Sequence, residues 1–304
     1  MSAFRHRPVL IEEIIGALSV VPSGWLVDAT LGGGGHAEAL LTARADLRLI
    51  AVDRDPAALQ AAGERLGPFG DRIELIHAPF SDLAFVLDSR GISSVSAVLA
   101  DLGVSSHHFD TGERGFSLQH SGPLDMRMDP TCGTPLSERL ATVTVEDLAD
   151  VLYAYGDIQR SIGTARLVLN AWREGADTTV ALAARLARKL EGRGRIHPAT
   201  AVFQALRMWV NDEEGELEAL LAMAPARLAI GGALAVIAFH SGEDRMVKQR
   251  FRHLGARRGS AFTMPRRKPT IAAPAEIEAN PRSRSAKLRV LVRVAPGGDG
   301  PNAS

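Results

Sequence analysis

The sequence has 304 residues, of which 46% are hydrophobic and 23% charged, which excludes a disordered chain. No apolar run approaches the roughly 18 residues that span a bilayer, and the first residues lack a signal-peptide core, so we expect a cytoplasmic protein. The single cysteine, Cys132, excludes a disulfide framework and a cysteine-rich metal cage, and we expect no metal site.

The formal net charge is +0, but the charges are segregated along the chain. Between Arg245 and Arg293 there are 14 Lys and Arg residues and two acidic ones, which gives +12 there and −12 elsewhere. A region this basic favours a polyanionic partner such as nucleic acid. A solvated helix face followed by a flexible basic tail explains the same pattern.

Short apolar runs alternate with helical patterns through the first third of the chain. Strands are expected at 25–28, 47–53, 73–78 and 95–102. Helices are expected at 37–44 and from Pro56, where the missing N–H of proline costs nothing. This alternation is typical of a parallel sheet covered by crossover helices, so we expect an α/β fold of the nucleotide-binding type.

After Asp110 the pattern changes to a polar segment rich in Gly and Pro, followed by amphipathic helices. Thr144 and Asp147 form a helix-capping pair, and further helices are expected at 159–172, 180–190, 198–211 and 214–222. The sheet then resumes at 234–239, followed by a basic helix at 244–254 and a closing strand at 288–294. We therefore expect a discontinuous domain over 1–110 and 200–296, a mainly helical insertion over 111–199, and a disordered tail over 297–304.

A glycine-rich turn follows the first expected strand. Gly32 to Gly35 and His36 come after Asp28, and Asp53 ends the second strand. Glycines let the backbone turn sharply near a cofactor, and a carboxylate at this place can accept hydrogen bonds from both hydroxyls of a ribose. The pair indicates a dinucleotide or adenosyl cofactor, with a purely structural turn and helix cap as the alternative.

Several long motifs occur in one order along nearly the whole chain. They are HRPVL (6–10), GGGGH (32–36), VDRD (52–55), DLGVSS (101–106), RGFS (114–117), PLDMRMD (123–129), HPAT (197–200), FQALR (203–207), FHS (239–241), EDR (243–245) and NPRSRSAKL (280–288). In these motifs the chain closely resembles the bacterial ribosomal RNA small-subunit methyltransferase H family.

The resemblance implies a Rossmann-like class I S-adenosylmethionine-dependent methyltransferase domain with a helical insertion that recognises the substrate. It implies methylation of the N4 amine of a decoding-centre cytidine in 16S ribosomal RNA, with the assembled 30S subunit as substrate. Carried onto matching positions, the cofactor-binding residues are Gly34, Gly35, His36, Asp53, Phe80, Asp101 and His108. The glycines and His36 would meet the methionine portion, Asp53 the ribose, Phe80 the adenine, and Asp101 the amino group.

The chain departs from the family pattern at four positions. His108 stands where glutamine is usual and Ala201 where arginine is common; Ile158 lies in a stretch that is usually more acidic, and Gly242 replaces leucine. These departures put the contact of His108, and the affinity for RNA, in question.

Methyl transfer from a sulfonium is an in-line displacement that needs alignment and a dry pocket. Groups that accept hydrogen bonds from the N–H groups of the amine help to localise its lone pair. Asp101 is the candidate for this role, together with the backbone carbonyls of 101–106. The Asp/Asn-Pro-Pro-aromatic sequence of many amino-methyltransferases is absent. Methylation at cytosine C5 would need a nucleophilic cysteine, and Cys132, in a polar loop, does not suit that role.

Two further groups of charged residues can be interpreted as structural or as functional. Asp125, Arg127 and Asp129 alternate with apolar residues, as either a salt-bridged loop or a wall of the active site. His240 and Glu243 are interpreted as a strand-end turn with a helix cap. The basic segments 244–254, 266–268 and 282–287 are expected to contact RNA phosphates, which gives affinity without sequence choice.

Two rival functions fit the same cofactor turn. An NAD-linked oxidoreductase would use the glycine loop and Asp53, and would reduce its cofactor without methyl transfer. A non-catalytic RNA-binding assembly factor would bind RNA without turnover. The sequence does not decide between a monomer and a homodimer.

Overall fold

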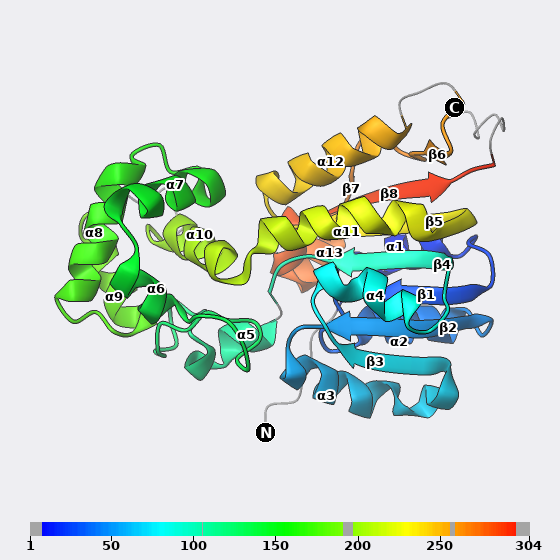
Figure 1. Ribbon diagram of the computed structural model, residues 1–304, viewed down its shortest axis with the longest axis horizontal. Helices are drawn as coiled ribbons and strands as arrows, with labels where there is room; N and C mark the ends of the chain where they lie inside the picture. The colour runs from blue at the N-terminus through cyan, green and yellow to red at the C-terminus, as the bar shows by residue number, and fades with distance from the viewer. Residues whose placement is uncertain (1–7, 105, 191–196, 256–258, 296–304) are drawn as a thin grey trace. The chain divides into compact units, whose positions relative to one another are not determined.

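The computed structural model describes residues 8–104, 106–190, 197–255 and 259–295. The chain divides into two compact units, a sheet unit (Met1–Gly103 with Gly215–Ser304) and a helical unit (Val104–Glu214). The sheet unit has an apolar core on each face of its sheet, and the helical unit has a core of its own (Figure 1).

The sheet unit contains one eight-stranded sheet with the order β3-β2-β1-β4-β5-β8-β6, and β7 pairs with β8. The strands are β1 (Gly24–Asp28), β2 (Leu47–Asp53), β3 (Ile73–His77), β4 (Val95–Asp101), β5 (Leu228–Ala238), β6 (Phe262–Thr263), β7 (Thr270–Ile271) and β8 (Lys287–Arg293). The pairs among β1 to β5 are parallel, and β8 is antiparallel to β5. The carboxyl ends of the five parallel strands therefore lie at one edge.

Helices cover both faces of this sheet. They are α1 (Ile11–Leu18), α2 (Gly35–Ala43), α3 (Pro56–Leu66), α4 (Leu83–Asp88), α11 (Glu213–Arg227), α12 (Ser241–Gly255) and α13 (Pro274–Ala279), with the 3₁₀ turns η1 (Gly67–Arg72), η2 (Phe80–Asp82) and η4 (Pro281–Ser285). Successive strand residues point to opposite faces, so Val98 joins the core under α4, α11 and α12, and Leu99 joins the core under α1, α2 and α3. The near-continuous apolar runs of β2 and β4 follow from this double burial.

The helical unit, green in Figure 1, packs its helices around a separate core. Its elements are α5 (Ser106–Asp110), η3 (Gly112–Arg114), α6 (Leu136–Thr142), α7 (Val145–Gly156), α8 (Ser161–Arg173), α9 (Thr179–Ala187) and α10 (Thr200–Asn211). The units divide after Gly103 and after Glu214, whereas the sequence-based boundaries lie at 110/111 and 199/200. Helix α10 belongs with this unit because Val202, Phe203 and Leu206 are buried in its core.

Element bounds differ from the predicted ones at a few places. Helix α11 continues through Pro225 to Arg227, and β5 begins at Leu228 instead of at 234. The early part of β5 has a register shift against β4, and a Cβ on Gly232 would lie 2.9 Å from the carbonyl oxygen of Ser96. Glycines in a strand often mark such an irregularity, but in the sequence they look like a turn. The first residues of β5 were therefore not predicted as part of the strand.

Helices α1, α4, α5, α6 and α13 were not predicted. The predicted tail over 297–304 lies outside the described residues. Within the described ranges, no helix is both long and apolar enough to pass through a membrane.

Candidate functional site

The end of β2 is tied to the glycine turn that follows β1. Asp53 accepts hydrogen bonds from the backbone N–H of Gly32 (Oδ2, 2.8 Å) and of Asp55 (Oδ1, 2.8 Å). Gly32 has φ +50°, a left-handed conformation that favours glycine. The carboxylate of Asp53 only accepts hydrogen bonds, with about four lone-pair positions on its two oxygens. This position suits the two hydroxyls of a ribose.

The same turn packs tightly against other parts of the chain. Gly34 has φ +74° and caps α2, and a Cβ on Gly35 would lie 2.5 Å from Cγ of Pro8. These two glycines are therefore required by the chain's own packing. Helix α2 begins at Gly35, and the N–H groups of a first helical turn have no intrahelical partner, so they form a place for an anionic group.

His36, in the first turn of α2, connects this turn to β4. Its Nε2 lies 2.8 Å from the carbonyl oxygen of Val9, and its Nδ1 lies 3.7 Å from Oδ2 of Asp101. A carbonyl only accepts, so Nε2 carries the proton. Burial lowers the pKa of His36 below its ordinary value, which keeps the ring neutral. The ring therefore positions its neighbours and has no second proton to donate.

Two carboxyl groups, the buried Asp28 and the partly buried Asp101, lie at the ends of β1 and β4. Burial raises the pKa of Asp101 to about 7, and the Glu243 carboxylate adds to this rise. Burial also raises the pKa of Asp28 to about 7, against the opposing effect of a hydrogen bond from the backbone N–H of Thr30. Thr30 links the two, because its N–H donates to Asp28 (3.1 Å) and its hydroxyl accepts from the N–H of Asp101 (2.5 Å).

Asp101 has an oxygen that makes no hydrogen bond. Its Oδ1 is buried, and no partner for it exists among the described residues. A buried acceptor without a donor is costly, so such an atom in a native fold calls for an explanation. A ligand that brings a donor, such as an ammonium group, would satisfy it.

The structure brings six of the seven predicted cofactor residues to the sheet unit and one to the helical unit. Phe80 follows β3 in η2 and is partly buried against the sheet core. The N–H of Ala78 donates to the carbonyl of Asp53 (3.1 Å), so the ends of β2 and β3 are adjacent. His108 lies in α5, where its buried ring contacts Phe116 at a centroid distance of 4.8 Å.

Of the other family departures, Ile158 packs against the helical core and Ala201 is exposed. The described residues contain no group of three or more His, Cys, Asp or Glu side chains arranged to hold a metal ion.

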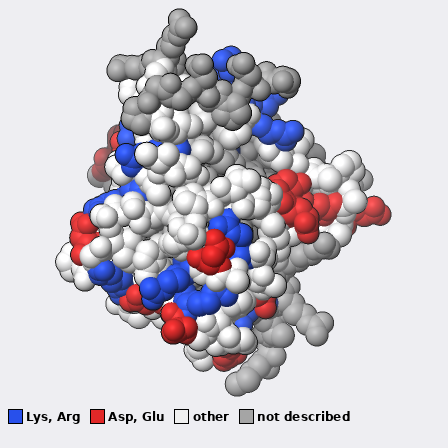
Figure 2. Space-filling view, turned by 90° about the vertical axis from the view of Figure 1, so that its right-hand side faces the viewer, with Lys and Arg blue, Asp and Glu red and all other residues white. Residues whose placement is uncertain are grey.

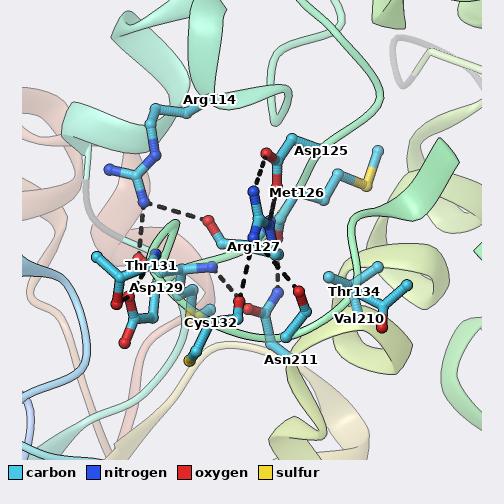
Figure 3. Close-up of polar contacts among 12 residues, drawn as sticks. Arg114, Asp125, Met126, Arg127, Asp129, Thr131, Cys132, Thr134, Val210 and Asn211 are labelled. Carbon is cyan, nitrogen blue, oxygen red and sulfur yellow. Dashed lines mark hydrogen bonds and ion pairs between the residues drawn. The ribbon is translucent and has the colours of Figure 1, made fainter. Parts of the chain in front are cut away.

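The loop over 123–134 is held by charged side chains (Figure 3). Asp125 and Arg127 form a two-pronged ion pair (2.7 and 2.8 Å), and Arg127 also donates to the carbonyls of Cys132 and Gly133. Arg114 donates to the carbonyl of Met128 (2.7 Å). The salt-bridged reading thus holds for Asp125 and Arg127.

Asn211, at the end of α10, fixes the backbone of the same loop. Its Oδ1 accepts from the N–H of Met128 (2.7 Å) and its Nδ2 donates to the carbonyl of Met126 (2.7 Å). Met126 has φ +62°, which is rare for a side chain of this size. Sequence reasoning missed Asn211 because the loop residues that it binds lie more than 80 residues away along the chain.

Glu243 caps the basic helix α12, as predicted for this turn. Its carboxylate accepts from the N–H groups of Phe239 (2.9 Å) and His240 (3.3 Å). The next residue, Asp244, pairs with Arg289 (2.7 Å) and Lys287 (3.6 Å) of β8. These two cations are therefore engaged within the protein.

A sheet with the order 3-2-1-4-5 and an antiparallel strand beyond β5, a glycine turn after β1, and carboxylates at the ends of β2 and β4 define a Rossmann-like enzyme of the class I S-adenosylmethionine-dependent methyltransferase type. Residues 3–294 match the model of the MraW methylase family. The chain belongs to this family, which confirms the resemblance found in the motifs.

Three relatives carry the name Ribosomal RNA small subunit methyltransferase H. The protein from Symbiobacterium thermophilum is 44% identical, over 97% of this chain and 98% of its own length. The one from Synechococcus sp. (strain RCC307) is 46% identical, over 96% and 97%. The one from Trichormus variabilis is 42% identical, over 99% and 96%.

Proposed function

We propose that the chain transfers a methyl group from S-adenosylmethionine to the exocyclic N4 amine of a decoding-centre cytidine in 16S ribosomal RNA. The observation that carries the proposal is the buried, unpartnered oxygen of Asp101 at the sheet edge that also holds Asp53 and the glycine turn. The names of the relatives support small-subunit ribosomal RNA as the substrate. The cytidine amine follows from the resemblance of the motifs.

The residues at this edge fit the cofactor. The carboxylate of Asp53, an acceptor of hydrogen bonds at the end of β2, matches the ribose hydroxyls, and Phe80 supplies an apolar surface for adenine. Oδ1 of Asp101 matches the amino group, and the first-turn N–H groups of α2, at Gly35 and His36, match the carboxylate of the methionine portion. Gly34 allows the turn that places these N–H groups, and His108 stays a proposal from the resemblance alone.

When bound, S-adenosylmethionine supplies a methyl group on a sulfonium sulfur, which is a good leaving group. The chain's residues must then align the amine, exclude water and accept a proton. Asp101 is the candidate acceptor, because it lies at the end of β4 and the cofactor's ammonium group would keep its carboxylate ionised and able to take a proton. An oxygen of the Asp101 carboxylate would also accept a hydrogen bond from the cytidine amine. This hydrogen bond would help the lone pair of the amine to face the methyl group.

RNA phosphates are proposed to bind the basic residues around α12 that are exposed at the surface. These are Arg245, Arg252, Arg266, Arg267, Lys268, Arg282 and Arg284. Figure 2 views the side on which the parallel strands begin, where Lys and Arg alternate with Asp and Glu in small groups of both signs. Ion pairs such as Arg227 with Asp88 are consistent with that mixture. Such a mixed surface suits nucleic acid less well than the α12 region.

We extend the proposal to the substrate's state, the protein's location and its assembly. The assembled 30S subunit is the proposed substrate, with the target base turned out of its stack toward Asp101, as is common for enzymes that modify bases. Action on ribosomal RNA supports a cytoplasmic location. A homodimer is a separate prediction. Light scattering of the purified protein measures its mass in solution and so tests this prediction directly.

The decisive experiment is transfer of labelled methyl from S-adenosylmethionine to small subunits that lack this modification, followed by nucleoside analysis. N4-methylated cytidine is the expected product. A C5-methylated product would overturn the assigned chemistry, and cofactor binding without transfer would favour an assembly factor. Reduction of NAD by the protein, with no methyl transfer, would establish the oxidoreductase alternative.

A further inference from the structure

One carboxylate in α11 contacts both loops that border the adenosine half of the proposed cofactor site. Oε2 of Glu216 accepts from the backbone N–H of Ser81 and Oε1 accepts from its hydroxyl, both at 3.0 Å. The guanidinium of Arg54 lies 3.8 Å from Oε2. The side chains of Arg54 and Glu216 are only 18% and 14% exposed, so this ion pair is shielded from solvent.

The partners of Glu216 are sequence neighbours of two residues that are proposed to bind the adenosine half of the cofactor. Ser81 directly follows Phe80, the residue proposed to pack on adenine, and Arg54 directly follows Asp53, proposed to bind the ribose. The two loops are also joined directly, because the ring of His77 bonds the carbonyl of Arg54 (3.0 Å). Glu216 thus holds both loops against the first turn of α11, at the same edge of the sheet.

We propose that Glu216 is a positioning residue for the adenosine half of the cofactor, an inference that rests on the proposed function. It orders η2 and the end of β2 before the cofactor arrives, so binding does not have to order them. Its loss therefore weakens every ligand that carries adenosine, whether or not the ligand carries the methionine portion.

The chain contains a matched control at the other end of the same two elements. Helix α11 is also tied to α4, the helix that continues η2, where Arg227 in its last turn pairs with Asp88 (2.7 Å). Asp88 ends α4, at the far end from η2. Asp88→Ala removes one carboxylate between the same helices without touching the loops after β2 and β3.

The test is calorimetric binding of S-adenosylmethionine and of methylthioadenosine, which lacks the amino-acid portion, to the full chain. Glu216→Ala is expected to weaken both by about tenfold, the size of one hydrogen bond to a charged group, and Glu216→Gln, which keeps one acceptor, by less. Asp88→Ala is expected to bind both like the wild type. Amide hydrogen exchange of the ligand-free protein should be faster at residues 80–82 in Glu216→Ala than in Asp88→Ala.

Each outcome bears on a separate claim. If the wild type binds neither ligand, the proposed function fails. If it binds both and Glu216→Ala binds them equally well, or if Asp88→Ala loses as much affinity, the positioning role is overturned. Ser81→Ala, which removes one donor and leaves α11 intact, gives a second measurement should Glu216→Ala not fold, and unchanged affinity in that variant counts against the inference.

Discussion

His36 and Asp101 face each other at the edge of the sheet, with Nδ1 of the imidazole 3.7 Å from Oδ2 of the carboxyl. Since Nε2 of His36 bonds Val9, the face turned to Asp101 is the unprotonated one. A neutral imidazole does little to stabilise the negative charge of the Asp101 carboxylate. The effect of burial therefore dominates, and the pKa of Asp101 is raised.

The stability of the ligand-free protein should fall as pH rises toward neutrality. The pKa of Asp101 is about 7 in the folded protein and 3.8 ordinarily, so the folded state holds a proton that the unfolded chain releases. This contribution is complete below pH 3.8 and is lost as pH rises through about 7. Urea unfolding at about pH 5 and about pH 8 should show a smaller difference in Asp101→Asn than in the wild type. Equal differences would contradict the assignment.

Cofactor binding should release a proton from Asp101. An ammonium group beside Oδ1 favours the ionised carboxyl, so affinity for S-adenosylmethionine should rise with pH up to about 7 and then level off. Calorimetry in two buffers of different ionisation enthalpy counts the protons released. Asp101→Asn should release fewer, and a count equal to the wild type's would exclude this contact. Asp101→Ala with normal turnover would exclude its role as the proton acceptor.

Gly35→Ala should destabilise the cofactor turn through a clash alone, because Gly35 is in helical conformation and its Cβ would lie 2.5 Å from Cγ of Pro8. We expect a loss of about 1–3 kcal/mol and weaker cofactor binding. Gly16→Ala, in α1 with open space around the new Cβ, is the matched control and should stabilise by about 0.5–1 kcal/mol. Thermal unfolding of both variants measures the contrast, and equal shifts would argue against the clash.

Asn211→Ala should destabilise the helical unit by about 2–4 kcal/mol, since it leaves the N–H of Met128 and the carbonyl of Met126 buried without partners. Gln204, on the same helix, makes one weak polar contact within the described ranges, to the sulfur of Met208 (4.0 Å), so Gln204→Ala should change stability by less than about 0.5 kcal/mol. Denaturant unfolding followed by tryptophan fluorescence compares the two. Similar losses would mean that Asn211 does not hold the loop.

Arg245→Ala and Arg252→Ala should each lower the salt dependence of RNA binding by about 0.7–0.9 in the slope of log K against log[salt], as expected when one phosphate contact is lost. Both residues are exposed on α12. Arg90→Ala, whose guanidinium pairs with Glu74, is the control and should leave the slope unchanged. Filter binding over a range of salt gives the slopes. A change as large in Arg90→Ala would mean that the RNA does not bind preferentially at α12.

The parts of the site that the sequence made predictable are local ones. The turn from Gly32 to His36 and the carboxylate of Asp53 stand directly after apolar strands, so position alone indicates their edge of the sheet. Asn211 and Glu216 could not be found this way, because they contact loops 85 and 135 residues distant. The start of β5 was missed for another reason: Gly231 and Gly232 separate its first three residues from the continuous apolar run that follows, and Ile230 is exposed.

The helical unit interrupts the sheet between β4 and β5, and this has a consequence during synthesis on the ribosome. The chain from Val104 to Glu214 is complete, and can collapse on its own core, before either β5 or β8 has been made. Until then β4, apolar on both faces, is an open edge that can pair with another chain. Newly made molecules should therefore be most prone to aggregate, and most dependent on chaperones, in the interval before residue 228 leaves the exit tunnel and β5 can cover that edge.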